Sequence, residues 1–141
     1  MAARCFAREN PPPVNHLEGF GVGTQRTEHY RHIVARFEEV ARANLGTFVR
    51  VSELCRTVGV TPRTLERAVR AIHAATPVEF LHALRLAEAR RSLLSKCGTA
   101  QSVTEVATRF GFRELGRFAG EYRERFGESP SETLRRNCQG E

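Results

Sequence analysis

The side chains of this sequence that could do chemistry are mainly arginines. Arginine accounts for all but one of the 22 basic residues, and Lys96 is the exception. A guanidinium group carries a permanent charge and a fixed fork of donors, which suits phosphate oxygens and the O6 and N7 atoms of guanine. The arginine content therefore favours nucleic acid as a partner, although a GC-rich genome would produce the same bias without functional meaning.

The positive charge is concentrated in the middle of the chain. The whole sequence carries a formal net charge of +6. Residues 51–96 hold eight basic and four acidic residues, residues 1–50 hold seven and five, and residues 97–141 hold seven of each. A surface that binds nucleic acid is therefore expected in the middle segment.

Other kinds of chemistry find little support. None of the four cysteines forms a CxxC pair or lies at zinc-finger spacing from a histidine, and Cys55 falls in an apolar helical pattern that favours a buried thiol. No paired acid and base, phosphate-binding loop or nucleophile constellation is present. We therefore predict no catalytic residue, no metal and no cofactor.

The chain also lacks a secretory signal and an apolar run of about 20 residues, which predicts a cytoplasmic protein without a disulfide framework.

The elements that must position the arginines are indicated by an internal repeat. Residues 51–60 line up with residues 103–112, and residues 76–79 line up with residues 129–132, at an offset of 52 to 53. Apolar positions between these segments also correspond. Because the matches occur in the same order in both copies, chance similarity explains them poorly.

The first copy has the pattern of a helix, a tight turn and a second helix. Apolar residues over 51–58 recur at helical spacing, and Gly59 supplies the left-handed conformation that ends a helix. Thr61 and Pro62 then form a helix start, with an N-cap threonine and a first-turn proline. The second helix is expected over about 62–73.

The second copy has the same pattern. Ser102 and Glu105 form a capping box, and Gly111 makes the turn. A longer helix is predicted from about Arg113 to Phe126. Its inner side is expected to carry Leu115, Phe118, Tyr122 and Phe126.

Further helices are predicted around the two copies. Residues 77–95 form a connecting helix, opened by a capping box at Thr76 and Glu79 and about 28 Å long at about 1.5 Å per residue. A supporting helix is expected over 28–45, ended by Gly46, and a short last helix begins at 129–132 and fades at Asn137. Residues 1–27, with a triple proline, are interpreted as a tail or linker, and residues 138–141 as a second tail.

Four segments resemble the AraC/XylS family of transcription factors. They are GVTPRTLER at 59–67, RLAEARRSLL at 85–94, VTEVATRFGF at 103–112 and RFGESP at 125–130. The resemblance covers roughly residues 34–137. It implies an all-α fold of seven helices, in which two homeodomain-like helix-turn-helix subdomains, at about 51–73 and 102–126, are joined by the long central helix, so that 28–137 forms one DNA-binding domain.

The same resemblance implies a sequence-specific, DNA-binding transcriptional regulator. Two recognition helices would enter successive major-groove segments of double-stranded DNA, so a single chain, as a monomer or weak dimer, could read an asymmetric site. Subunits of RNA polymerase are candidate protein partners. Members of this family usually carry a separate sensing domain, for which 27 preceding residues are too few, so neither an effector nor a target operon follows from the sequence.

In the first helix-turn-helix subdomain, the resemblance and the helical pattern together indicate which residues contact DNA. By position, Arg63, Glu66 and Arg67 match places where the family contacts bases. Their chemistry also fits this role, because arginine suits guanine and glutamate accepts a hydrogen bond from cytosine N4. Glu66 is equally well explained as an intrahelical partner of Arg70. The full set expected to face DNA is Thr61, Arg63, Thr64, Glu66, Arg67 and Arg70, with Thr61 and Arg70 assigned to phosphate.

The second unit departs from the family pattern. Gly116 and Gly120 stand where the family commonly has a serine and an arginine, and two glycines weaken a helix and remove side chains that could reach DNA. Arg113, Leu115 and Arg117 remain as expected contacts. We therefore predict that the first unit provides sequence specificity and the second provides backbone contacts or protein contacts.

Three alternatives differ from specific DNA binding. An adaptor that binds proteins and has lost DNA binding would fit the neutral second unit. A DNA-repair enzyme would need a metal-holding cysteine cluster upstream, which Cys5 alone does not form. An RNA-binding protein would need exposed aromatic residues for base stacking, and the outward positions have none.

Overall fold

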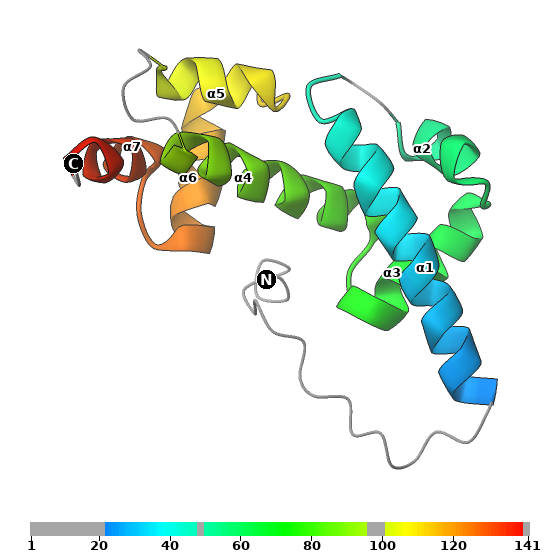
Figure 1. The fold of residues 1–141 in the computed structure, drawn as a ribbon. Helices are drawn as coiled ribbons and strands as arrows, with labels where there is room; N and C mark the ends of the chain where they lie inside the picture. The colour runs from blue at the N-terminus through cyan, green and yellow to red at the C-terminus, as the bar shows by residue number, and fades with distance from the viewer. Residues whose placement is uncertain (1–21, 48–49, 96–100, 140–141) are drawn as a thin grey trace. The chain divides into compact units, whose positions relative to one another are not determined.

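The computed structural model describes residues 22–47, 50–95 and 101–139, and within these residues all regular secondary structure is α-helical (Figure 1). This confirms the predicted all-α fold with seven helices. The helices are α1 (Val22–Ala43), α2 (Val51–Val58), α3 (Pro62–His73), α4 (Pro77–Ser95), α5 (Val103–Arg109), α6 (Leu115–Phe126) and α7 (Pro130–Gln139).

The chain forms two compact units, each with its own core. Among the described residues, unit 1 comprises 22–43 and 50–81, and unit 2 comprises 44–47, 82–95 and 101–139. The boundary falls inside α4, so the first residues of this helix belong to unit 1 and the remainder to unit 2.

In unit 1, α1 packs mainly against α3 and also against α2. Phe37 of α1 and both Leu65 and Val69 of α3 have no exposed surface. Phe80, at the start of α4, adds its ring at 6.0 Å from that of Phe37, measured between ring centroids. Complete burial of side chains of this size stabilises a fold by about 1.5–3 kcal/mol each. This packing fixes which face of α3 points inward.

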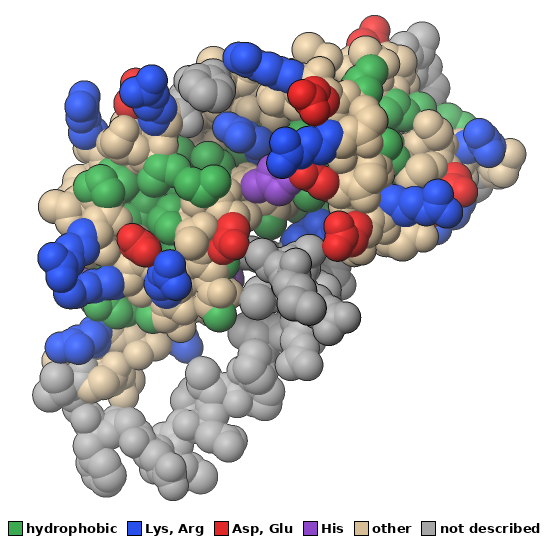
Figure 2. Space-filling view, turned by 180° about the vertical axis from the view of Figure 1, so that it is seen from behind, with side chains coloured by type: hydrophobic (Ala, Val, Ile, Leu, Met, Phe, Trp, Pro, Cys, Tyr) green, Lys and Arg blue, Asp and Glu red, His purple; other side chains and the backbone are tan. Residues whose placement is uncertain are grey.

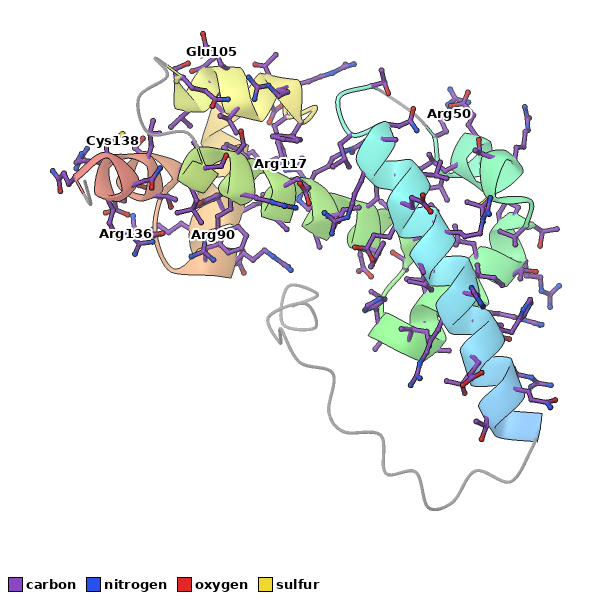
Figure 3. All side chains as sticks on the ribbon, in the orientation of Figure 1. Arg50, Arg90, Glu105, Arg117, Arg136 and Cys138 are labelled. Atoms are coloured by element: carbon purple, nitrogen blue, oxygen red, sulfur yellow. The ribbon has the colours of Figure 1, made fainter. Side chains whose placement is uncertain are left out.

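The turn between α2 and α3 follows the sequence prediction. Gly59 adopts the left-handed conformation at φ 84°, and the Thr61 hydroxyl oxygen accepts a hydrogen bond from the Thr64 N–H at 3.2 Å. At the start of α2, the backbone N–H of Arg50, which is labelled in Figure 3, donates a hydrogen bond to the Glu53 carboxylate at 3.0 Å. The helix starts are therefore held by local polar contacts as well as by the core.

Unit 2 is built around an aromatic row on α6. The Phe118 ring lies 4.5 Å from that of Phe112 and 5.8 Å from that of Tyr122, and Tyr122 lies 4.7 Å from Phe126. Gly111, at φ 86°, makes the predicted turn between α5 and α6. The buried residues of this core are Leu86, Ala89, Leu93, Val106, Ala107, Phe118 and Tyr122.

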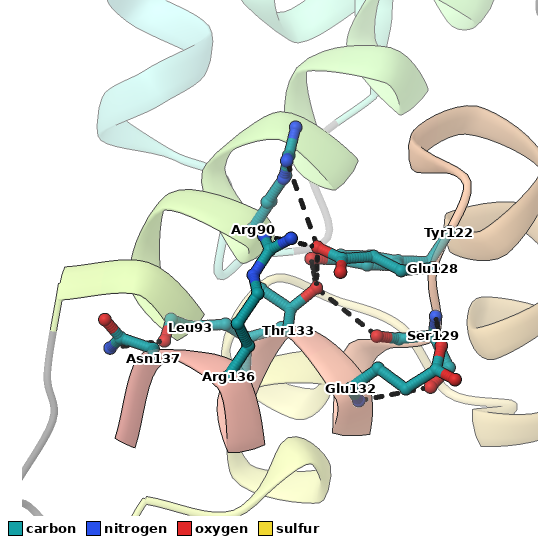
Figure 4. A network of polar contacts seen from close by, with 9 residues as sticks. All are labelled: Arg90, Leu93, Tyr122, Glu128, Ser129, Glu132, Thr133, Arg136 and Asn137. Carbon is teal, nitrogen blue, oxygen red and sulfur yellow. Dashed lines mark hydrogen bonds and ion pairs between the residues drawn. The ribbon is translucent and has the colours of Figure 1, made fainter. Parts of the chain in front are cut away.

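A polar network holds α7 in unit 2 (Figure 4). The buried Tyr122 hydroxyl donates to the Thr133 hydroxyl at 2.8 Å, which donates to the Glu128 carboxylate at 2.7 Å. Arg136 donates to the same Glu128 oxygen at 2.9 Å. Burial raises the pKa of the Tyr122 hydroxyl, and the hydrogen bond with Thr133 opposes that rise. The phenol is therefore a stable donor, because it remains protonated at neutral pH.

The predicted boundaries of several helices need correction. The segment predicted as a tail up to residue 27 is helical from Val22. The first turns of α1 are exposed, so they contain no apolar pattern from which a helix could be predicted. The second recognition helix begins at Leu115 instead of Arg113, and α7 continues to Gln139 instead of fading at Asn137. The predicted spans 62–73 and 77–95 are confirmed, as is the burial of Cys55.

Gly46 has a different role from the predicted one. The helix already ends at Ala43, and residues 44–47 pack as part of unit 2. A Cβ atom at Gly46 would lie 2.9 Å from the carbonyl oxygen of Arg109. Glycine is needed here because the loop and the end of α5 approach each other closely.

Candidate nucleic-acid interface

The exposed face of α3 brings together the residues predicted in the first unit. Leu65, Ala68 and Val69 are fully buried on the inner side. Thr64 is half-buried, and its hydroxyl oxygen lies 2.9 Å from that of Thr61, so these two hydroxyls serve the helix start. The exposed residues opposite the buried face are Arg63, Glu66, Arg67 and Arg70.

Glu66 and Arg70 form an ion pair on α3. The Arg70 Nε atom lies 3.1 Å from the Glu66 carboxylate, and both side chains are at least half exposed. The structure therefore shows the intrahelical pair that the sequence offered as one explanation of Glu66. An exposed pair at this spacing contributes about 0.3–0.5 kcal/mol, so a DNA contact could replace it at little cost.

The start of α6 presents fewer side chains. Leu115 is 42% exposed, which corrects its assignment to the inner side of the helix. Arg113 lies in the turn before α6 and is exposed, and Arg117 is 74% exposed with its Nε atom 3.1 Å from the Glu121 carboxylate. Gly116 and Gly120 are exposed with open space above them. The three predicted contacts of unit 2 thus lie within five positions around one helix start.

An open cleft in unit 2 adjoins these residues. Its lining includes His82 and Arg85 of α4 together with Arg113, Arg117 and Glu121. The Arg85 Nε atom is buried and makes no hydrogen bond to the described residues, and desolvation by burial lowers the pKa of this guanidinium. His82 and Arg85 were not predicted as site residues, since both stand among apolar residues in a helix whose pattern defines no single face.

Among the described residues, no group of three or more histidine, cysteine, aspartate or glutamate side chains is placed to hold a metal ion. None of the described helices is long and apolar enough to cross a membrane.

Replacing Gly120 with alanine is expected to stabilise the chain by about 1 kcal/mol, because Gly120 lies inside α6 and a Cβ there meets no atom within 4 Å. Chemical denaturation measures this change. Gly127→Ala is the matched control, since that residue ends α6 in the left-handed conformation at φ 77° and alanine should cost about 1–2 kcal/mol there. Destabilisation by Gly120→Ala would contradict the open surroundings of this position.

The sequence has relatives among known regulators. A family model described as a helix-turn-helix domain matches residues 54–136, more than half of the chain. The chain is 44% identical over 85 residues to a probable thc operon regulatory protein of Rhodococcus erythropolis, covering 60% of this chain and 26% of that protein. It is 34% identical over 106 residues to the XylDLEGF operon transcriptional activator of Pseudomonas putida, covering 75% and 32%. The chain thus spans about a quarter to a third of the length of these relatives.

Solved structures are similar to this chain in fold. A probable AraC family transcriptional regulator from Rhodopseudomonas palustris matches with a TM-score of 0.65 and 34% identity, over 74% of this chain and 96% of that one. The DNA-binding domain of AdpA, a global transcriptional factor solved in complex with a target DNA, matches with a TM-score of 0.61 and 27% identity, over 79% and 94%. The chain belongs to the AraC/XylS family of helix-turn-helix transcriptional regulators, and its described helices correspond to the DNA-binding domain of that family.

Proposed function

We propose that this chain binds double-stranded DNA at a specific sequence and regulates transcription there, with α3 as the principal reading helix. The observation that carries the proposal is the exposed face of α3. Arg63 and Arg67 stand on the side opposite the fully buried Leu65 and Val69. Arginine side chains on an outward helix face can form bidentate hydrogen bonds to guanine in the major groove.

The second unit contributes differently in this proposal. Residues 97–141 carry no net charge, and α6 exposes glycines where longer side chains would reach the bases. Arg113 and Arg117 remain able to contact phosphates, and Leu115 could contact a thymine methyl group. We therefore assign sequence-independent contacts to α6 and base contacts mainly to α3.

The relatives are longer than this chain, so an effector and protein partners enter the proposal in general form only. RNA polymerase subunits are one class of protein partner in this proposal. A protein-interaction adaptor is the second candidate function, favoured by the 42% exposed Leu115 at the start of α6, within a segment (97–141) that carries no net charge. An exposed leucine of this kind suits a protein contact as well as a DNA contact.

Selection from a random-sequence pool of DNA duplexes tests the proposal. The purified chain is expected to enrich an asymmetric site, and its affinity for that site should exceed its affinity for unrelated duplex by about 10³-fold or more. Enrichment of no sequence, together with weak and uniform binding, would favour the adaptor instead.

A further inference from the structure

The Glu121 carboxylate contacts two side chains, one on its own helix α6 and one on α4. One carboxylate oxygen lies 3.1 Å from the Arg117 Nε atom, one turn away on α6. The other lies 2.8 Å from the His82 Nε2 atom on α4. Both carboxylate oxygens of this side chain are therefore engaged, and the side chain is only 28% exposed.

The pair on α3 differs in this respect. Glu66 is 51% exposed, and within the described residues its polar side-chain contact is with Arg70 of the same helix. That carboxylate can turn into solvent when Arg70 moves. Glu121 cannot do so as freely, because moving it also breaks the contact with His82 on a different helix.

The position of Glu121 puts it in competition with DNA. A carboxylate and a phosphate both accept hydrogen bonds from the same guanidinium fork. Arg117, at 74% exposure near the start of α6, can present its guanidinium to a phosphate, and it must leave or share Glu121 to bind one. Part of the affinity that Arg117 could give is thus lost in breaking the internal pair.

We propose that Glu121 weakens the sequence-independent binding of unit 2 to DNA, because its carboxylate competes with backbone phosphates for Arg117. This inference rests on the proposed function and deepens it. His82 is the positioning residue in this arrangement, since it holds the carboxylate beside Arg117.

Restraining Arg117 would help a sequence-specific DNA-binding protein to discriminate between its site and unrelated DNA. Phosphate contacts strengthen binding to every duplex alike, and a genome offers a vast excess of unrelated sites. On the face of the molecule in Figure 2, acidic side chains are interspersed among basic ones. A carboxylate that restrains Arg117 therefore leaves binding more dependent on the base contacts assigned to α3.

Affinity for an unrelated duplex, measured at fixed salt, tests the proposal. Glu121→Gln is expected to strengthen binding about two- to fivefold beyond the gain given by Glu124→Gln, which makes the same charge change at an exposed position of the same helix. Arg117→Ala is expected to weaken binding to all duplexes alike, and by a factor about two to five larger in the Glu121→Gln background than in the unaltered chain.

Equal gains from Glu121→Gln and Glu124→Gln would overturn the proposal, because the effect would then be one of net charge. An excess of the Glu121→Gln gain over the Glu124→Gln gain that persists when Arg117 is alanine would overturn it as well. Failure of the proposed function has a different signature, since the unaltered chain would then prefer no sequence, whatever Glu121→Gln does to its binding of unrelated duplex. The Arg117 Nε–H resonance then tests the contact between Arg117 and Glu121 without DNA. If Glu121→Gln does not reduce the protection of this N–H from solvent exchange, the proposed contact is overturned.

Discussion

Replacing Arg63 and Arg67 with alanine is expected to remove most of the sequence preference of this chain. Each arginine lies on the exposed face of α3, where a bidentate contact with guanine discriminates against the wrong base by about 1–3 kcal/mol. Loss of one such contact lowers affinity for the selected site about 5- to 150-fold. Binding to unrelated duplex should fall much less, so the two affinities should converge.

The measurement compares the selected site, its single-base variants and an unrelated duplex for each variant. Arg63→Ala and Arg67→Ala should each relax discrimination at one base pair, which identifies the base that each side chain reads. Arg56→Ala is the matched control, because Arg56 is exposed on α2 and its loss makes the same charge change. If both α3 variants kept the parent's site preference and salt dependence, α3 would not be the recognition helix.

Thr133→Val is expected to destabilise unit 2 by about 1–3 kcal/mol. Valine has nearly the shape of threonine, but it leaves the buried hydroxyl of Tyr122 without the acceptor that now lies at 2.8 Å. A buried donor without a partner costs its desolvation free energy, whereas removing both partners costs much less. Chemical denaturation should therefore show a lowered midpoint with an unchanged slope.

The double variant Tyr122→Phe with Thr133→Val provides the control. It removes both hydroxyls, so its free energy of unfolding should lie closer to that of the unaltered chain than that of Thr133→Val alone. If the two substitutions were additive, the hydrogen bond of Figure 4 would contribute nothing to the stability of the fold.

Local signals made α3 and α4 predictable from the sequence. Thr61 and Pro62 mark the start of α3, and the capping box of Thr76 and Glu79 opens α4 with reciprocal hydrogen bonds of 3.2 and 2.8 Å. These signals depend on neighbouring residues alone, so no knowledge of the tertiary structure is needed. The exposed face of α3 followed in the same way from the spacing of Leu65 and Val69.

Features that depend on tertiary contacts were not predictable. The first turns of α1 are exposed and have no apolar periodicity, so their helical structure could not be detected. The contact between His82 and Glu121 joins residues 39 positions apart. Leu115 occupies a helical position equivalent to buried residues, and only the packing of unit 2 shows that it is exposed. The role of Gly46 likewise depends on the distant carbonyl of Arg109.

The loop at residues 44–47 has a consequence for the order of folding. Its neighbours on both sides in the chain belong to unit 1, yet Leu45 is buried and the loop packs as part of unit 2. During synthesis, all of residues 22–81 are made before residues 109–111, so the loop has no surface to dock on until these later residues have been added. Unit 1 is therefore not a contiguous stretch of chain that can be cut out by itself. The shortest fragment that gives Gly46 its native neighbour must extend past Arg109.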